Sequence, residues 1–191
     1  QVIKRGGELY VWSRGEELVT DKYPEYQVLR QQLPDGTVLD GEIIGWREGL
    51  PLPFASLQTR IGRKLVGKKQ LSDTPVAFIA YDVLEYKNQD VRDLPFSERR
   101  DMLETIAAQA NSDVLVLSNI IEAPDWAALA EKRINALDMK AEGLMLKRKD
   151  SVYKTGRKRG DWWKWKLDAR VIDAVLIYAQ QGHGRRANLY T

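Results

Sequence analysis

The run VAFIAYDVLEY at residues 76–86 constrains the fold more than any other stretch, because β-branched and aromatic residues dominate its whole length. Such a run predicts a β-strand with Phe78 and Asp82 on one face and Tyr81 on the other. A second run, TVLDGEIIGW at 37–46, follows an Asp-Gly turn and predicts another strand. The chain is therefore expected to fold around a β-sheet.

Shorter signals surround these two strands. The residue patterns predict further strands at 2–5, 8–13, 113–118, 162–167 and from Glu142 onward, and helices at 24–33, 54–65, 98–110 and 125–138. Ser97 is expected to cap the third helix, and Pro124 or Asp125 to begin the fourth. Because the helices lie between strands that group as antiparallel pairs, and the sequence has no glycine-rich phosphate loop, the pattern predicts an α+β fold.

Composition excludes several kinds of site. The 191 residues include no cysteine, which excludes disulfides and thiolate metal sites. The sequence has no long apolar run and no signal-peptide pattern, so we expect no membrane span. The single histidine, His183, lies in Gly-His-Gly, where a turn position is favoured over a catalytic one.

Positive charge is concentrated in one segment of the chain. Residues 142–166 carry nine lysines and arginines against three acidic residues, a net charge of +6, whereas the whole chain has a net charge of +3. A localised positive field of this kind indicates a phosphate-bearing partner that is bound at one place.

The end of this segment has the spacing of a two-faced strand. Periodicity places Lys164 and Lys166 on one face with Trp162, and places Trp163, Trp165 and Leu167 on the other. Two neighbouring ammonium groups repel each other unless an anion lies between them, and phosphate is the obvious candidate. Glu142, near this basic site, could hold a divalent metal that bridges phosphate oxygens. The alternative is an ordinary half-buried strand with solvated lysines.

The strand at 37–46 carries two acidic residues. Asp40 and Glu42 lie two positions apart, so both carboxylates project from one face. Burying them would be costly unless a positive group meets them. Gly41, between them, would allow a ligand or another backbone to approach closely. The alternative is an edge strand with a solvated acidic face.

Both ends of the chain have the pattern of strands. The sequence opens on QVIKRGGELYVW without a methionine and stops at NLYT, so we expect it to be a fragment of a longer protein. From about residue 169 the pattern becomes strand, glycine turn and strand with no helix signal. A second, all-β domain is therefore expected to begin there.

Five short motifs occur in a fixed order along the chain: SRG (13–15), DGE (40–42), FIAYDVL (78–84), EGLMLK (142–147) and WWKWK (162–166). Together they resemble the motif series of the covalent nucleotidyltransferases, and among these the ATP-dependent DNA ligases match best. LPFASLQTRIGRK and LPFSERRDML resemble two further segments of the ligases. The resemblance covers nearly the whole chain.

The resemblance implies a fold and its domain boundary. Residues 1–168 would form an ATP-grasp-like adenylation (nucleotidyltransferase) domain of antiparallel sheets with flanking helices. Residues 169–191 would begin an OB-fold β-barrel.

The resemblance also assigns roles to individual residues. Lys164 and Lys166 would hold the α-phosphate of ATP, Tyr81 would stack on adenine, and Glu42 and Glu142 would bind Mg²⁺ or Mn²⁺. The full set expected at the nucleotide is Arg14, Glu42, Tyr81, Glu142, Lys164 and Lys166. The set expected at DNA is Lys147, Arg148, Lys149, Arg157, Lys158 and Arg159.

The implied activity is ATP-dependent sealing of nicked double-stranded DNA through a lysine–AMP intermediate. The family's nucleophile lies in a Lys-x-Asp-Gly motif, which this sequence lacks, because neither Asp-Gly pair follows a lysine at that spacing. The parent protein is thus expected to be a ligase, whereas this chain alone should not adenylylate itself. A monomeric, intracellular protein is expected, cytoplasmic at the nucleoid in a bacterium or archaeon.

Two alternatives remain at this point. An RNA ligase or a capping-type guanylyltransferase shares the order of motifs, and nucleotide preference would separate it from a DNA ligase. A non-catalytic nucleic-acid-binding module would use the basic loop and tryptophans to bind DNA with a steep salt dependence, but would not bind ATP.

Overall fold

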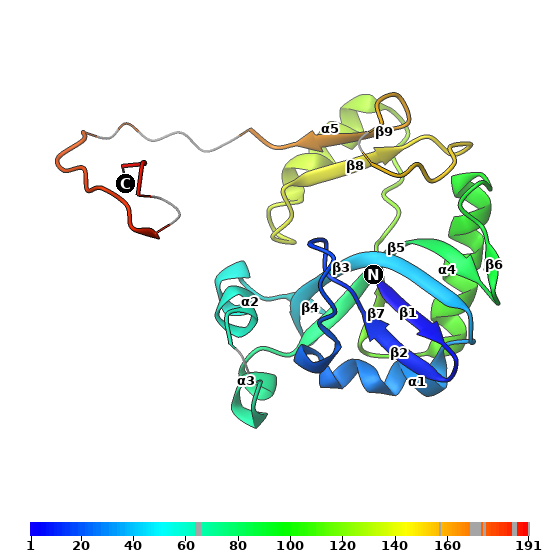
Figure 1. Ribbon diagram of the computed structural model, residues 1–191. Helices are drawn as coiled ribbons and strands as arrows, with labels where there is room; N and C mark the ends of the chain where they lie inside the picture. Colours follow the sequence, from blue (N-terminus) through cyan, green and yellow to red (C-terminus); the bar gives the residue numbers. More distant parts are fainter. Residues whose placement is uncertain (64–65, 157, 169–172, 174, 185–186, 191) are drawn as a thin grey trace.

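A large mixed sheet and a small two-stranded sheet organise the chain (Figure 1). The structure is a computed structural model that describes residues 1–63, 66–156, 158–168, 173, 175–184 and 187–190. In the seven-stranded sheet the order is β2-β1-β3-β5-β6, with β4 paired to β3 and β7 paired to β5. Apart from the parallel β5–β7 pair, these pairings are antiparallel, which confirms the predicted α+β fold.

The strands and helices follow the predicted pattern closely. The strands are β1 (Val2–Arg5), β2 (Glu8–Val11), β3 (Thr37–Arg47), β4 (Leu50–Pro51), β5 (Val76–Tyr86), β6 (Gln89–Asp90), β7 (Leu115–Leu117), β8 (Gly143–Lys147) and β9 (Trp162–Lys166). The helices are the 3₁₀ turns η1 (Thr20–Lys22) and η2 (Pro24–Val28), and α1 (Leu29–Gln32), α2 (Phe54–Ile61), α3 (Lys68–Asp73), α4 (Phe96–Ala110) and α5 (Trp126–Asn135).

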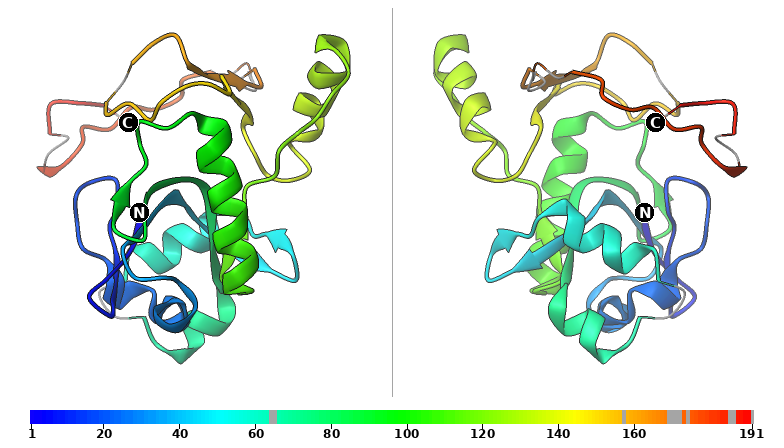
Figure 2. Two further views of the ribbon diagram at one scale, coloured as in Figure 1. Left: turned by 90° about the vertical axis from the view of Figure 1, so that its right-hand side faces the viewer. Right: turned by 90° about the vertical axis from the view of Figure 1, so that its left-hand side faces the viewer.

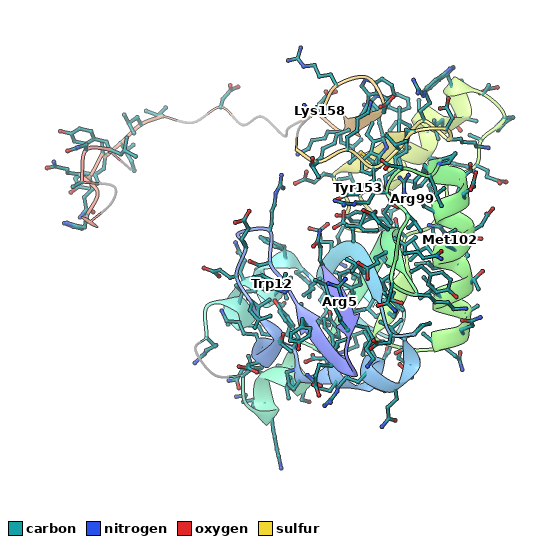
Figure 3. All side chains as sticks on the ribbon, turned by 45° about the vertical axis from the view of Figure 1, so that its right-hand side comes forward. Arg5, Trp12, Arg99, Met102, Tyr153 and Lys158 are labelled. Atoms are coloured by element: carbon teal, nitrogen blue, oxygen red, sulfur yellow. The ribbon has the colours of Figure 1, made fainter. Side chains whose placement is uncertain are left out.

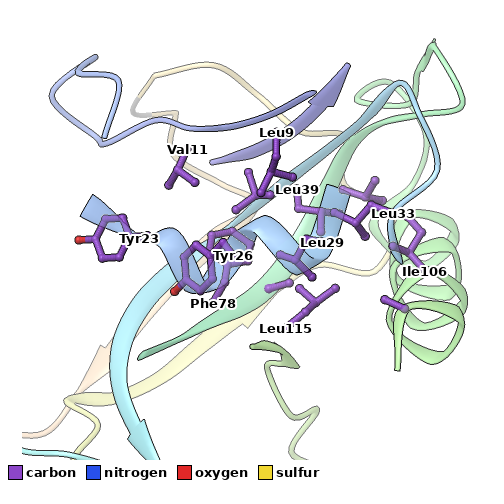
Figure 4. Packing of buried hydrophobic residues seen from close by; sticks show 14 of the residues in the cluster. Leu9, Val11, Tyr23, Tyr26, Leu29, Leu33, Leu39, Phe78, Ile106 and Leu115 are labelled. Carbon is purple, nitrogen blue, oxygen red and sulfur yellow. The ribbon is translucent and has the colours of Figure 1, made fainter. Parts of the chain in front are cut away.

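The hydrophobic core lies between the large sheet and the helices η2, α1 and α4 (Figure 4). Strand residues such as Leu39 and Phe78 pack there against Tyr26, Leu29 and Ile106 from the helical side. Pro24 begins η2 because its fixed φ suits a first helical position. Apolar residues at helical spacing place one face of residues 24–33 against the core, as the sequence predicted.

A bulge in β5 changes which face Asp82 occupies. The pairing of β3 with β5 shifts between Asp40 opposite Asp82 and Gly41 opposite Ala80, so Tyr81 is an extra residue. An extra residue turns consecutive side chains toward the same side of a sheet. Lys147 contacts both the Tyr81 ring and the Asp82 carboxylate. The prediction that Tyr81 and Asp82 point to opposite faces was therefore wrong.

The small sheet of β8 and β9 lies on one side of the large sheet (Figure 2), and α4 reaches from one toward the other. Trp165 packs against α5, where its ring is edge-on to that of Trp126. Asp125 caps α5 by accepting a hydrogen bond from the Ala128 amide, as predicted. Helix α5 thus covers the outer face of the small sheet at Trp165, whereas Trp163 on the same face stays 50% exposed.

Several boundaries differ from the sequence prediction. Helix α2 ends at Ile61, before the predicted limit, and α3 was not predicted. Ser97 does not cap α4, because the helix begins at Phe96 and the Ser97 amide donates to the carbonyl of Lys149. Among the described residues beyond Asp168, pairing is limited to a bridge between Gln181 and Tyr190, so the second domain stays a prediction.

A buried ion pair joins α4 to the large sheet. Asp82 accepts two hydrogen bonds from Arg99, at 2.8 and 3.1 Å, and both side chains are 0% exposed. Arg99 also donates to the carbonyls of Leu94 and Ser151. The second of these contacts reaches the loop after β8, so the pair also helps to place the small sheet.

We predict that Asp82→Asn lowers the free energy of unfolding by about 3–5 kcal/mol, because it leaves Arg99 buried without a countercharge. Urea denaturation followed by circular dichroism would measure the change. Asp90→Asn is the matched control, since Asp90 binds Arg92 in the same forked way but on the surface. Equal losses in the two variants would contradict the prediction.

Candidate active site

Tyr81 lies at the centre of one group of predicted site residues on the large sheet. Burial raises the pKa of its phenol, and the negative charges of Asp40 and Glu42 raise it further, while the nearby positive charge of Arg14 acts in the opposite direction. The strand register agrees, because Asp40 lies opposite Asp82 and Gly41 opposite Ala80, so the DGE segment of β3 runs beside Tyr81. The structure therefore brings Glu42 and Tyr81 together, and the charge of Arg14 acts on the same phenol. These are three of the six residues predicted at the nucleotide.

The two acidic residues of the DGE motif differ in their surroundings. Strand β3 pairs with β5 from Val38 to Gly45, whereas it pairs with β1 only at Thr37–Leu39. Asp40 is half-buried and accepts a 2.8 Å hydrogen bond from the Tyr153 hydroxyl, whereas Glu42 is exposed. Glu42 is thus the carboxylate that is free to meet a ligand.

Gly41 is required by the neighbouring strand. A Cβ at this position would lie 2.5 Å from the carbonyl oxygen of Ile79 and 2.5 Å from the Phe78 ring. Of the two possibilities that the sequence left open, a ligand or another backbone, the second therefore applies. The close packing fixes the register in which Asp40 and Glu42 face Tyr81.

Glu142, Lys164 and Lys166 form a second group on the small sheet. Gly143 has a φ of +138°, and a Cβ there would lie 2.3 Å from the carbonyl oxygen of Trp165, so β8 and β9 approach closely because it is glycine. Glu142 forms a 2.5 Å ion pair with Lys166. This hydrogen bond, followed by the positive charges of Lys166 and Lys164, lowers the pKa of the Glu142 carboxyl. Glu142 itself therefore supplies a countercharge to the two lysines.

The lysine face of β9 is turned toward the large sheet. Trp162 shares this face with Lys164 and Lys166. Its ring lies edge-on to that of Tyr153, at 5.5 Å between centroids, and its indole donates to Ser151. Figure 3 shows Tyr153 and Arg99 where the small sheet meets α4. The two groups of site residues thus lie on surfaces that face each other.

Comparison with known proteins now identifies the family. The sequence model described as ATP dependent DNA ligase domain matches residues 1–166. The chain belongs to this family. Its order of motifs and its mixed helix and sheet architecture agree with this assignment.

Individual relatives agree with this assignment. A DNA ligase of Natronomonas pharaonis is 36% identical over 99% of this chain and 34% of the relative. Mycobacterial DNA ligase D complexed with ATP and MES has a TM-score of 0.65 at 29% identity, over 84% of this chain and 48% of that one. Chlorella virus DNA ligase-adenylate has the same fold, with a TM-score of 0.58 at 20% identity over 86% and 58%. The chain spans about a third of the length of the curated relatives it matches.

One of the predicted DNA contacts in this ligase domain lies inside the protein. The Lys147 side chain is only 10% exposed and its ammonium lies 3.7 Å from the Asp82 carboxylate. A group that is enclosed in this way cannot reach a DNA phosphate. The assignment of Lys147 to DNA is corrected accordingly. Sequence reasoning missed the network of Lys147, Asp82, Arg99 and Tyr153, although DSVY and SERR carried two of its members.

The remaining predicted DNA contacts lie on the basic loop between β8 and β9. Lys149, Lys158 and Arg159 are exposed, and Lys158 stands away from the sheets in Figure 3. Arg148 forms ion pairs with Asp150 and Asp161, which reduce the local positive charge. Arg157 lies outside the described residues.

The carboxylates do not by themselves form a metal cage. In the part of the chain that the structure describes, no three acidic or histidine side chains gather closely enough to hold a metal ion. Glu42 and Glu142 belong to different sheets. Mg²⁺ commonly binds one or two carboxylates together with substrate phosphates and water. Glu42 and Glu142 are both exposed, and their carboxylates have the oxygen chemistry that this mode of binding uses.

We predict that Gly41→Ala destabilises the domain by roughly 2 kcal/mol, because the added methyl group would collide with the β5 backbone. Thermal unfolding would measure this change. Gly62→Ala is the matched control, since its φ is −68° and an added Cβ would lie 3.6 Å from the Gln58 carbonyl oxygen, an ordinary contact. A loss of stability at Gly41 no larger than that at Gly62 would disprove the steric explanation.

The Glu142–Lys166 pair predicts a pH effect. Lys166 holds the pKa of the Glu142 carboxyl below its ordinary value of 4.5. The stabilisation that the ion pair gives to the folded state is therefore present above pH 4.5 and is lost as the pH falls through the lowered pKa. Carbon NMR of the Glu142 carboxyl should show a titration below pH 4.5 that returns toward 4.5 in Lys166→Met. An unchanged titration in this variant would disprove the pairing.

Proposed function

We propose that this chain is the ATP-binding core of a DNA ligase that acts within a longer protein. The longer protein would join the 5′-phosphate and 3′-hydroxyl ends of a nick in double-stranded DNA. The observation that supports the proposal is that Lys147 of the small sheet contacts the Tyr81 ring, which turns the lysine face of β9 toward the sheet that carries Tyr81 and Glu42. The mycobacterial relative that was solved with ATP supports the choice of nucleotide.

In this proposal each sheet supplies one half of the nucleotide site. The Tyr81 ring stacks on adenine and Arg14 meets a phosphate, while Lys164 and Lys166 neutralise charge at the α-phosphate. Lys166 would exchange its contact with Glu142 for a phosphate oxygen. Glu42 and the released Glu142 would then hold Mg²⁺ or Mn²⁺, which would neutralise the phosphate oxygens further.

The covalent steps need a lysine that this sequence does not offer in a Lys-x-Asp-Gly motif. We propose that another segment of the longer protein supplies it. Its amine would attack the α-phosphorus of ATP, losing a proton as the bond to pyrophosphate breaks. The AMP would pass to the 5′-phosphate of the nick, and the 3′-hydroxyl would then displace it.

DNA would bind along the basic loop. Lys149, Lys158 and Arg159 are exposed there, and their side chains are the ones expected to meet DNA phosphates. Such contacts predict an affinity for nicked DNA that falls steeply with salt. We propose residues 1–168 as the adenylation domain and 169–191 as the beginning of an OB-fold domain.

The cellular setting belongs to the same proposal. We infer a monomeric protein that works inside the cell, and at the nucleoid if its source is a bacterium or archaeon. No helix of the described residues is long and apolar enough to cross a membrane. The family assignment does not favour an RNA ligase or capping enzyme.

Nucleotide binding by the chain tests the proposal directly. Calorimetry should detect ATP binding that Tyr81→Leu weakens roughly tenfold, since base stacking on an aromatic ring is worth about 1–3 kcal/mol. Tyr81→Phe is the matched control, because it keeps the ring and should retain the affinity. Binding of DNA without any binding of ATP would instead favour the non-catalytic nucleic-acid module.

A further inference from the structure

Lys147 at the end of β8 is enclosed by aromatic rings from three elements. Its ammonium lies 4.1 Å from the ring centroid of Trp162 on β9, 4.6 Å from that of Phe96 on α4 and 5.0 Å from that of Tyr81 on β5. It also donates a hydrogen bond, at 3.4 Å, to the main-chain carbonyl of Tyr81. One side chain from the small sheet thus holds both the ring and the backbone of a residue on the large sheet.

The nearby carboxylate does not need Lys147. Asp82 already accepts two hydrogen bonds from Arg99, at 2.8 and 3.1 Å, whereas the Lys147 ammonium lies 3.7 Å away. Burial lowers the pKa of Lys147, and the charges of Asp82 and Asp40 act against this effect. Burying the Lys147 ammonium therefore costs folding free energy. A variant with an apolar side chain of similar length at this position should fold as well as the unaltered chain.

The favourable interactions of the Lys147 ammonium are mainly with the three aromatic rings. A desolvated ammonium is attracted to the faces of aromatic rings, and this attraction depends on where the rings lie. Among the three aromatic residues, Tyr81 is the one that lies beside the DGE segment of β3, where Asp40 is opposite Asp82 and Glu42 is opposite Ile79. A charge that fixes this ring would therefore act on the nucleotide site without touching the nucleotide.

We propose that Lys147 is a positioning residue that holds the ring of Tyr81 in place as the platform for the purine base. The proposal rests on the proposed function, because it takes ATP as the ligand of that site. Lys147 makes no contact with substrate in this scheme. Its position on β8 also ties the small sheet, with Lys164 and Lys166, to the platform on the large sheet.

The test variant removes the positive charge of Lys147 and keeps a side chain of similar volume. Lys147→Met should weaken ATP binding to the chain roughly fivefold, the effect of losing a desolvated cation–ring contact. Its melting temperature should change by less than about 4 °C, because Asp82 keeps Arg99 as its partner. Lys69→Met is the matched control on the exposed surface of α3 and should alter neither quantity.

A double-mutant cycle then asks whether Lys147 acts through Tyr81. In a Tyr81→Leu background, Lys147→Met should change ATP affinity by less than about twofold, because the ring it positions is absent. An equal loss in both backgrounds would overturn the inference, as would unchanged affinity in Lys147→Met or a much larger fall in melting temperature. Failure of the unaltered chain to bind ATP would instead remove the proposed function itself.

Discussion

The buried pairing of Asp82 with Arg99 is the interaction on which the arrangement of the two sheets depends. Both side chains are fully enclosed, and Nη1 of the guanidinium donates to two main-chain carbonyls. One of these carbonyls belongs to Ser151, beyond β8, so a single arginine joins the large sheet, α4 and the small sheet. Charges that are removed from water must find partners, and such partners are few and directional. The pair therefore specifies one placement of the small sheet.

The two ends of the small sheet have different surroundings. Lys147 and Trp162 are held among aromatic rings at one end, whereas Glu142, Lys164 and Lys166 are exposed at the other. Rigidity at one end and access at the other suit a phosphate site. Lys164 and Lys166, the cations that would meet a nucleotide, are exposed to water. The other end of the same sheet is held beside Tyr81 by the water-excluding contacts of Lys147 and Trp162. Positioning of this kind is what phosphoryl-transfer chemistry requires of a protein.

Local signals in the sequence were sufficient for most of the secondary structure. The long strands β3 and β5 were predicted because their β-branched and aromatic residues suit a half-buried pleated surface. The cap of α5 was predicted because Asp125 needs only the next turn of chain to make its bond. Ser97 failed as a cap because α4 begins one residue earlier, at Phe96, which places Ser97 inside the first turn, where its amide donates to the distant carbonyl of Lys149. Tyr81 and Asp82 were assigned to opposite faces because a bulge arises from pairing with β3, not from β5 alone.

The sequence by itself determined the order of the motifs, the concentration of positive charge before β9 and the identity of the residues that can meet phosphate. Those properties depend on residue type and spacing, which the chain carries whether folded or not. Only the tertiary structure decided that Lys147 is enclosed rather than exposed, that Glu142 neutralises Lys166, and that Asp82 binds Arg99. Each of these facts depends on the distance between segments far apart in sequence. Desolvation and ion pairing act on that distance, and only the folded chain establishes it.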